Sequence, residues 1–96
     1  MEISKLTENE ISLSKETLSK WAFSENSLKR EFKFTDFKEA FAFMTQVALI
    51  AESMNHHPSW QNMFNLVIVE LSTHDLGGLT MLDLQLAKEI DSIASK

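Results

Sequence analysis

Hydrophobic and polar positions alternate along two parts of the chain, which predicts strands there. In residues 28–34 (LKREFKF), Leu28, Arg30, Phe32 and Phe34 alternate with the charged residues 29, 31 and 33, which is the period of a half-buried strand. Together with residues 21–23 (WAF) and the turn-rich SENS between them, this stretch predicts a β-hairpin. Residues 62–73 (NMFNLVIVELST) are rich in β-branched side chains and predict a longer strand, with a shorter one before it at 59–63.

A helical period replaces the strand period over residues 35–55. Asp36 is a candidate N-cap, and Glu39 follows three residues later. The apolar positions of this segment cover about half of the helix circumference, a wider arc than packing on one sheet face requires. Ala42 and Leu49 also fall on the otherwise polar side. Two interpretations remain open, because scattered apolar residues are common on surfaces but could also mark a helix–helix contact between subunits.

Two capping boxes mark the starts of two further helices. Thr7 with Glu10 predicts a short helix to about residue 14, and Thr80 with Asp83 predicts a terminal helix. The apolar stripe of that terminal helix recurs at helical spacing: Leu82, Leu86, Ile90 and Ile93. After the short first helix, the predicted order of elements is β-β-α-β-β-α. We therefore expect an α+β fold, a two-layer sandwich in which a four-stranded antiparallel sheet carries two helices on one face.

Length, charge and cysteine content narrow the class of protein. The chain has 96 residues, which predicts one domain over residues 1–96. It contains no cysteine, so disulfides and thiolate metal sites are excluded. The net charge of −5 argues against nucleic acid or an anionic membrane as a partner. No apolar run is long enough for a signal peptide or a membrane span, so we expect a soluble, cytoplasmic protein. Small domains of this kind often gain stability by forming oligomers.

Candidate chemistry concentrates in residues 55–60 (NHHPSW), which hold two of the three histidines, the only proline and one of the two tryptophans. Glu52 and His56 are four residues apart and share a face if the long helix reaches His56. Pro58 pushes the residue before it toward extended geometry, so His56 and His57 should point in different directions.

The third histidine, His74, stands where the long strand ends, beside Asp75 and just before Gly77-Gly78. If this strand end lies near the helix end, three imidazoles and one or two carboxylates converge. Imidazole with carboxylate suits zinc or iron, but there is no His-Glu-x-x-His motif and adjacent histidines rarely bind one ion together, so we expect no metal. Acid–base catalysis and a purely structural role are equally compatible with the spacing.

Three further residues have a structural and a functional interpretation each. Asp83 completes a capping box, which accounts for it without any chemistry. Trp60 and Phe64 could belong to the core or form a wall against a planar ligand. For Phe64 we expect the core, whereas Trp60 stands closer to the expected cleft. No serine sits in a nucleophile-elbow motif, so a nucleophilic triad is not indicated.

The spaced set Glu52, His56-His57-Pro58, Phe64, His74 and Asp83 resembles the signature of the pterin-4a-carbinolamine dehydratases. The stretches FTDFKEAFAFMTQVALIAESMNHHPSW and LVIVELSTHDLGGLT are similar to that family as well. The similarity extends from about Phe32 to Ile93, and LTENEI near the start also looks like the family's opening. A motif this long is far more specific than a lone pair of histidines, and it favours the acid–base interpretation.

The resemblance implies a reaction and roles for the residues. Aromatic amino-acid hydroxylases leave their tetrahydropterin as a 4a-hydroxy adduct, and the family removes water from it to give quinonoid dihydropterin. No metal and no bound cofactor are needed. By this resemblance, His56 and His74 would be acid catalysts and His57 would mainly hold the substrate. Glu52 would orient His56 or exchange protons with it. The implied substrate-binding residues are His57, Asn55, Pro58, Trp60 and Asp83, with Asp83 supporting the site near His74.

Two positions depart from what many animal members of the family carry. Asn55 stands where an aspartate is common, and Leu82 stands where an arginine often precedes the final aspartate. The histidines remain, so these departures bear on pterin affinity and side-chain preference rather than on the class of reaction.

The resemblance also implies an assembly and an alternative function. Family members are homodimers or homotetramers, with sheets joined across subunits and long helices packed together in the tetramers. The surplus apolar positions agree with this: Ala42, Leu49, Leu66 and Ile68. Animal relatives also act as dimerisation cofactors of a homeodomain transcription factor, so the alternative is a protein-interaction module with a vestigial pterin site. The complete set of three histidines, Glu52 and Asp83 favours the enzyme.

Overall fold

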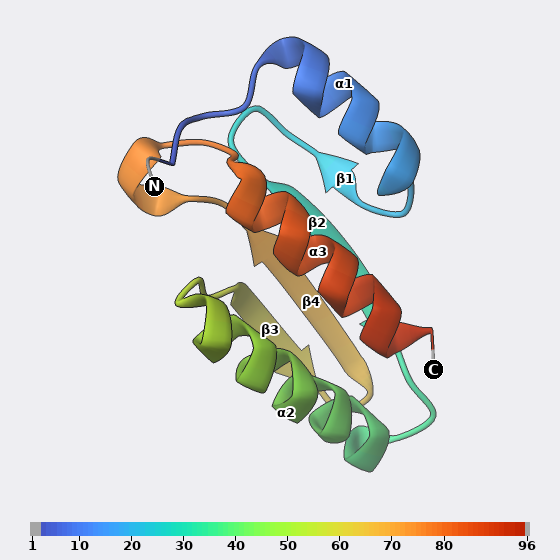
Figure 1. The fold of residues 1–96 in the computed structure, drawn as a ribbon. Helices are drawn as coiled ribbons and strands as arrows, with labels where there is room; N and C mark the ends of the chain where they lie inside the picture. Colours follow the sequence, from blue (N-terminus) through green and yellow to red (C-terminus); the bar gives the residue numbers. More distant parts are fainter. Residues whose placement is uncertain (1–2, 96) are drawn as a thin grey trace.

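The computed structural model describes residues 3–95, which form an antiparallel sheet covered by helices (Figure 1). The elements in chain order are α1 (Glu8–Thr17), β1 (Ala22–Phe23), β2 (Leu28–Lys33), α2 (Phe37–Met54), β3 (Ser59–Met63), β4 (Leu66–Leu71), the short 3-10 helix η1 (His74–Leu76) and α3 (Met81–Ala94). The sheet has four strands in the order β1-β2-β4-β3. Figure 1 shows α2 and α3 side by side in front of the sheet. The predicted α+β fold is confirmed.

The sheet has one buried face and one open face, as the alternation predicted. Leu28 and Phe32 of β2 pair with Leu71 and Val67 of β4, and all four side chains are buried beneath the helices. The neighbouring pair Lys29 and Glu70 points to the opposite, open face. Because side chains alternate along a strand, this register assigns every residue of β2 and β4 to one of the two faces.

Helix α2 buries a narrower stripe than its apolar arc predicted. Its buried residues recur every three or four positions: Ala40, Phe43, Val47 and Ala51. Phe37, Phe41 and Leu49 remain 48%, 55% and 69% exposed, so the helix keeps apolar surface that this chain does not cover. No helix within residues 3–95 has the length and apolar character required to cross a bilayer.

The helix starts follow the predicted caps. The Thr7 and Thr80 capping boxes are both formed, and the Asp36 carboxylate accepts a hydrogen bond from the Glu39 backbone. Helix α1 continues to Thr17, beyond the predicted end near residue 14.

The long strand predicted over residues 62–73 is wrong at both ends. Residues 64–65 form a tight turn between β3 and β4, in which Phe64 adopts a left-handed backbone with φ of 54°. The Phe64 side chain is therefore at the tip of the hairpin and 64% exposed, so the expectation that it belongs to the core is wrong. At the other end, β4 stops at Leu71 and leaves Ser72 and Thr73 outside the strand.

Candidate active site

The end of α2 separates the two adjacent histidines. The helix ends at Met54, and Asn55 takes a left-handed conformation with φ of 51° and ψ of 41°. Asparagine tolerates this region better than most residues, so it is a suitable helix terminator. The His56 backbone N–H still bonds to the Ala51 carbonyl, at 3.1 Å. The chain then passes through Pro58 and enters β3. The two histidines point in different directions, as predicted, since each contacts a different carboxylate.

His56 points inward and contacts the start of α3. Its Nε2 lies 2.6 Å from Oδ1 of Asp83, and the Asp83 side chain is completely buried. The His56 ring is itself 90% buried. This contact joins the C-terminal end of α2 to the first turn of α3, so the two helices hold the imidazole between them.

The second oxygen of Asp83 is also occupied. Asp83 Oδ2 accepts hydrogen bonds from the Thr80 backbone N–H at 2.9 Å and from the Thr73 hydroxyl at 2.8 Å. The Thr73 and Thr80 hydroxyl oxygens are 2.7 Å apart, so the Thr80 hydroxyl can donate to Thr73 in turn. A carboxylate that accepts on both oxygens fits the ionised form, which has acceptors only.

This network fixes the tautomer of His56. Because Asp83 Oδ1 accepts, the His56 Nε2 must carry the hydrogen in the neutral ring, and its Nδ1 is then an acceptor. Nδ1 makes no hydrogen bond within residues 3–95, and no buried side-chain nitrogen there lacks a partner, so Nδ1 is accessible to solvent. In the neutral ring, the nitrogen that the protein leaves without a hydrogen bond is therefore the acceptor, Nδ1.

His57 lies on the surface and pairs with Glu52. Its Nε2 is 2.8 Å from Oε1 of Glu52, and the two side chains are 55% and 80% exposed. The resemblance implied that Glu52 orients His56 or exchanges protons with it, whereas in this structure Glu52 contacts His57. The spacing argument assumed a helix through His56, but the left-handed Asn55 ends the helix before it and returns His57 toward Glu52.

The resemblance implied that Asp83 supports the site near His74. In this structure Asp83 contacts His56, and the hydroxyl of Thr73, the residue before His74, donates to its Oδ2. His74 begins η1 and is exposed. The loop closes through the Thr73 N–H to Gly78 carbonyl bond of 2.8 Å and the left-handed Gly77, with φ of 64°.

All three histidines line one open cavity of about 210 Å³, and the convergence predicted from the sequence is present. The lining residues come from the end of α2 and the segment after β4: Asn55, His56, His57, Ser72, Thr73, His74 and Asp75. A neighbouring cavity of about 230 Å³ also includes His74. Within residues 3–95, no three His, Asp or Glu side chains are placed to share a metal ion.

The remaining predicted substrate-binding residues lie outside this cavity's lining. Asp83 is behind His56 and completely buried, and Pro58 only directs the chain into β3. Trp60 pairs with Val69 across β3 and β4, and its indole packs, partly buried, against the core. Sequence reasoning missed Ser72 and Thr73, although hydroxyl side chains directly before a candidate histidine are a recognisable signal.

The comparisons with known proteins agree with the geometry of the site. The family model described as pterin 4 alpha carbinolamine dehydratase matches residues 4–93. A protein of Prochlorococcus marinus, provisionally named a pterin-4-alpha-carbinolamine dehydratase, is 52% identical over 93 residues, which cover 97% of each chain.

Solved structures give the same result for the fold. The crystal structure of a transcriptional coactivator/pterin dehydratase from Brucella melitensis superposes with a TM-score of 0.91 and 42% identity, covering 95% of this chain and 99% of that one. A pterin dehydratase-like RuBisCO assembly factor of the alpha-carboxysome has a TM-score of 0.65 and 21% identity, over 79% of this chain and 88% of that one, which shows the fold alone. The family match, the identity over nearly the whole chain and the three histidines around one cavity together show that the chain belongs to the pterin-4-alpha-carbinolamine dehydratase family.

Proposed function

We propose that the protein catalyses the removal of water from a 4a-hydroxytetrahydropterin, giving the quinonoid dihydropterin, through acid–base chemistry of its histidines. The observation that carries this proposal is the meeting of His56, His57 and His74 around one cavity, in a chain of this family. The volume of about 210 Å³ suits a flat bicyclic ring lying against the opening better than a fully enclosed ligand.

The reaction needs one proton delivered and one proton removed. The bond between C4a and the hydroxyl oxygen breaks with its electron pair on oxygen, and an acid protonates this oxygen so that water leaves. The N5 proton passes to a base, and its electron pair forms the double bond between N5 and C4a. One proton is gained by the protein and one is lost, so no metal or redox partner enters the balance.

His56 is suited to be the base. Asp83 holds Nε2–H, so Nδ1 accepts the N5 proton, and the ionised Asp83 stabilises the imidazolium that forms. His74, which is exposed and lines the same cavity, is then the acid for the leaving hydroxyl. This assignment differs from the resemblance, which implied an acid role for both residues. His57 and Asn55 line the same cavity, and in this proposal they hold the pterin ring.

Assembly belongs to the same proposal. The exposed apolar residues of α2, namely Phe37, Phe41 and Leu49, fit a packing surface between copies of the chain. The outer edge of β3 is open within residues 3–95, where β3 pairs with β4 alone. A homodimer or homotetramer would cover these surfaces. The alternative function, an interaction module with a vestigial pterin site, would use the same face of α2.

A stopped-flow absorbance experiment distinguishes the two functions. Decay of 4a-hydroxytetrahydropterin is followed near neutral pH with the wild-type protein and with His74→Ala. His74 is exposed and makes no side-chain hydrogen bond within residues 3–95, so this substitution leaves the fold intact. We expect the wild type to accelerate the decay in proportion to its concentration, and His74→Ala to lose about 100-fold or more of that rate.

The control is Lys38→Ala, an exposed substitution at the start of α2 that should retain the full rate. Folding of each variant is checked by its thermal midpoint. No acceleration by well-folded wild-type protein would reject the dehydratase and favour the interaction module.

A further inference from the structure

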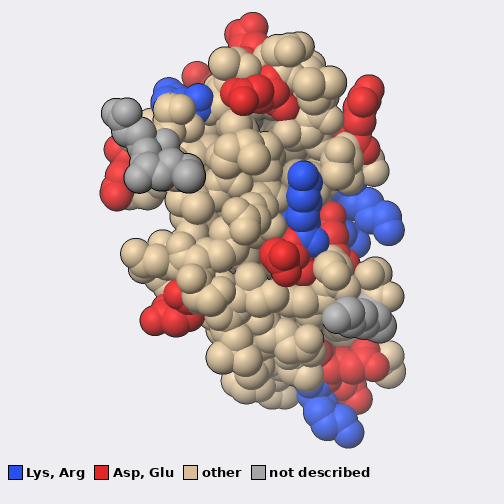
Figure 2. Space-filling model, viewed as in Figure 1, with Lys and Arg blue, Asp and Glu red and all other residues tan. Residues whose placement is uncertain are grey.

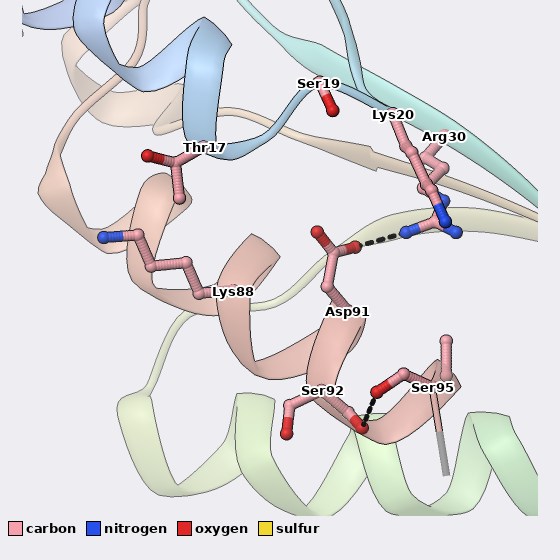
Figure 3. Close-up of a pocket in the computed structure, with 9 residues that line it drawn as sticks. Thr17, Ser19, Lys20, Arg30, Lys88, Asp91, Ser92 and Ser95 are labelled. Atoms are coloured by element: carbon pink, nitrogen blue, oxygen red, sulfur yellow. Dashed lines mark hydrogen bonds and ion pairs between the residues drawn. The ribbon is translucent and has the colours of Figure 1, made fainter.

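A second cavity lies away from the histidines. It has a volume of about 440 Å³ and is bounded by the end of α1, the segment between α1 and β1, strand β2 and the last turns of α3. Figure 3 shows Lys20 and Arg30 on one side, Lys88 on the other and Asp91 between them. Ala94 and four hydroxyl residues complete the lining: Thr17, Ser19, Ser92 and Ser95.

Arg30 is held in a fixed position inside this cavity. Its Nη1 donates to Oδ1 of Asp91 at 2.6 Å, and the same oxygen accepts the Trp21 indole N–H at 2.8 Å. The Arg30 guanidinium also lies 4.3 Å from the centroid of the Phe32 ring, a cation–π contact. Its side chain is only 18% exposed. These contacts fix the orientation of the guanidinium, whose Nε and Nη2 make no hydrogen bond within residues 3–95.

The lining of the cavity is positively charged, whereas the protein as a whole is negatively charged. The chain carries a net charge of −5, whereas three cations and one carboxylate give this cavity a formal charge of +2. Two helices end here, and their C-terminal partial charges of roughly −0.5 each offset about half of that excess. The local balance stays positive. Within residues 3–95, neither Lys20 nor Lys88 forms an ion pair, so neither amine is neutralised by a protein carboxylate. Figure 2 shows basic side chains in the middle and at the right of this face.

We propose that this cavity binds a small phosphate-bearing molecule. A phosphate monoester carries close to two negative charges near neutral pH and matches both the fork of Arg30 and the flanking lysines. The volume is larger than inorganic phosphate fills, so an organic portion should lie beside the phosphate. Oδ2 of Asp91 makes no hydrogen bond within residues 3–95 and can accept one from a hydroxyl of that portion. This proposal does not depend on the dehydratase activity.

The two tryptophans provide a direct test. The Trp21 indole N–H contacts Asp91 in the cavity wall, whereas Trp60 lies on β3, outside the lining. We expect titration with ribose 5-phosphate at constant ionic strength to shift the Trp21 indole signal saturably in 1H–15N spectra, without shifting Trp60. Inorganic phosphate should bind more weakly, and succinate should produce no saturable shift, because its two carboxylates are too far apart to act as one dianion at Arg30.

Matched double variants separate a site from general electrostatics. Lys20→Gln with Lys88→Gln removes two cavity cations, and Lys33→Gln with Lys38→Gln removes the same charge elsewhere; all four lysines are exposed. We expect the first pair to raise the Kd for ribose 5-phosphate at least about tenfold and the second to change it less than about twofold. The absence of a saturable Trp21 shift, or an equal effect of the two pairs, would overturn the proposal. Unchanged thermal midpoints show that neither pair acts through unfolding.

Discussion

Replacing Asp83 by asparagine tests whether the buried carboxylate sets the reactive nitrogen of His56. The backbone N–H of Thr80 can only donate, so the amide oxygen of the new side chain must stay where Oδ2 of Asp83 accepts that bond at 2.9 Å. The amide NH₂ then faces Nε2 of His56, in the position where Oδ1 lies 2.6 Å from the ring. Two donors cannot face each other, so the imidazole must move its hydrogen to Nδ1. The free nitrogen becomes a donor and can no longer accept the N5 proton.

The size of both effects follows from the contacts. A hydrogen bond to a charged group contributes about 1.5–3 kcal/mol and a neutral one about 0.5–1.5, so Asp83→Asn should cost about 1–2 kcal/mol of stability. For a domain of this size, that lowers the thermal midpoint by roughly 5 to 15 °C. Loss of a positioned general base lowers kcat by about 100-fold to 10,000-fold. The loss of activity therefore far exceeds what partial unfolding can produce at a temperature below the midpoint.

Two measurements are needed. Long-range 1H–15N correlation spectra identify the His56 tautomer, and stopped-flow absorbance gives the dehydration rate at a temperature where the variant is folded. The matched control is Asp36→Asn, which makes the same change of charge at the N-cap of α2, where asparagine caps as well as aspartate. It should retain both activity and tautomer. If Asp83→Asn kept the hydrogen on Nε2, or kept activity within about twofold of the wild type, the reasoning about His56 would be refuted.

Two further predictions concern the surface. Glu52→Gln removes the partner of His57, and because exposed ion pairs contribute at most about 1 kcal/mol, we expect an unchanged thermal midpoint and a rise in KM of no more than about fivefold. A comparable fall in kcat at constant KM would instead place Glu52 in the proton transfer. Leu49→Lys places a charge on the exposed apolar face of α2, and we expect light scattering to show a smaller assembly with the same circular dichroism spectrum. An unchanged mass would exclude that face from the interface.

The elements that could be predicted from the sequence are those whose cause is local. The capping hydroxyls of Thr7 and Thr80 act within one helical turn, and the alternation along β2 needs only its own side chains. The tip of the β3–β4 hairpin was missed because Phe64 carries no turn signal of its own. Its left-handed backbone is imposed by the pairing of the two strands on either side.

The meeting of the three histidines could be predicted from the sequence, but the Ser72 and Thr73 lining and the pairings of the side chains could not. From spacing alone, the helical neighbour of Glu52 is His56, four residues later. The left-handed conformation of Asn55 ends the helix before His56, and Glu52 contacts His57 instead. In the same way, Asp83 reaches His56 because α3 packs against the end of α2, a contact between residues 27 positions apart. Such tertiary contacts have no signature in a single sequence.

The left-handed Asn55 divides the site into two parts with different evolutionary freedom. On one side, His56 is anchored through Asp83 to Thr73 and Thr80, so a substitution there is penalised by the stability of the whole domain. On the other side, His57 and Glu52 are solvent-exposed, and changing them costs little folding free energy. In the proposed reaction, folding stability therefore constrains the base, His56, whereas activity alone constrains the exposed His57, Glu52 and His74.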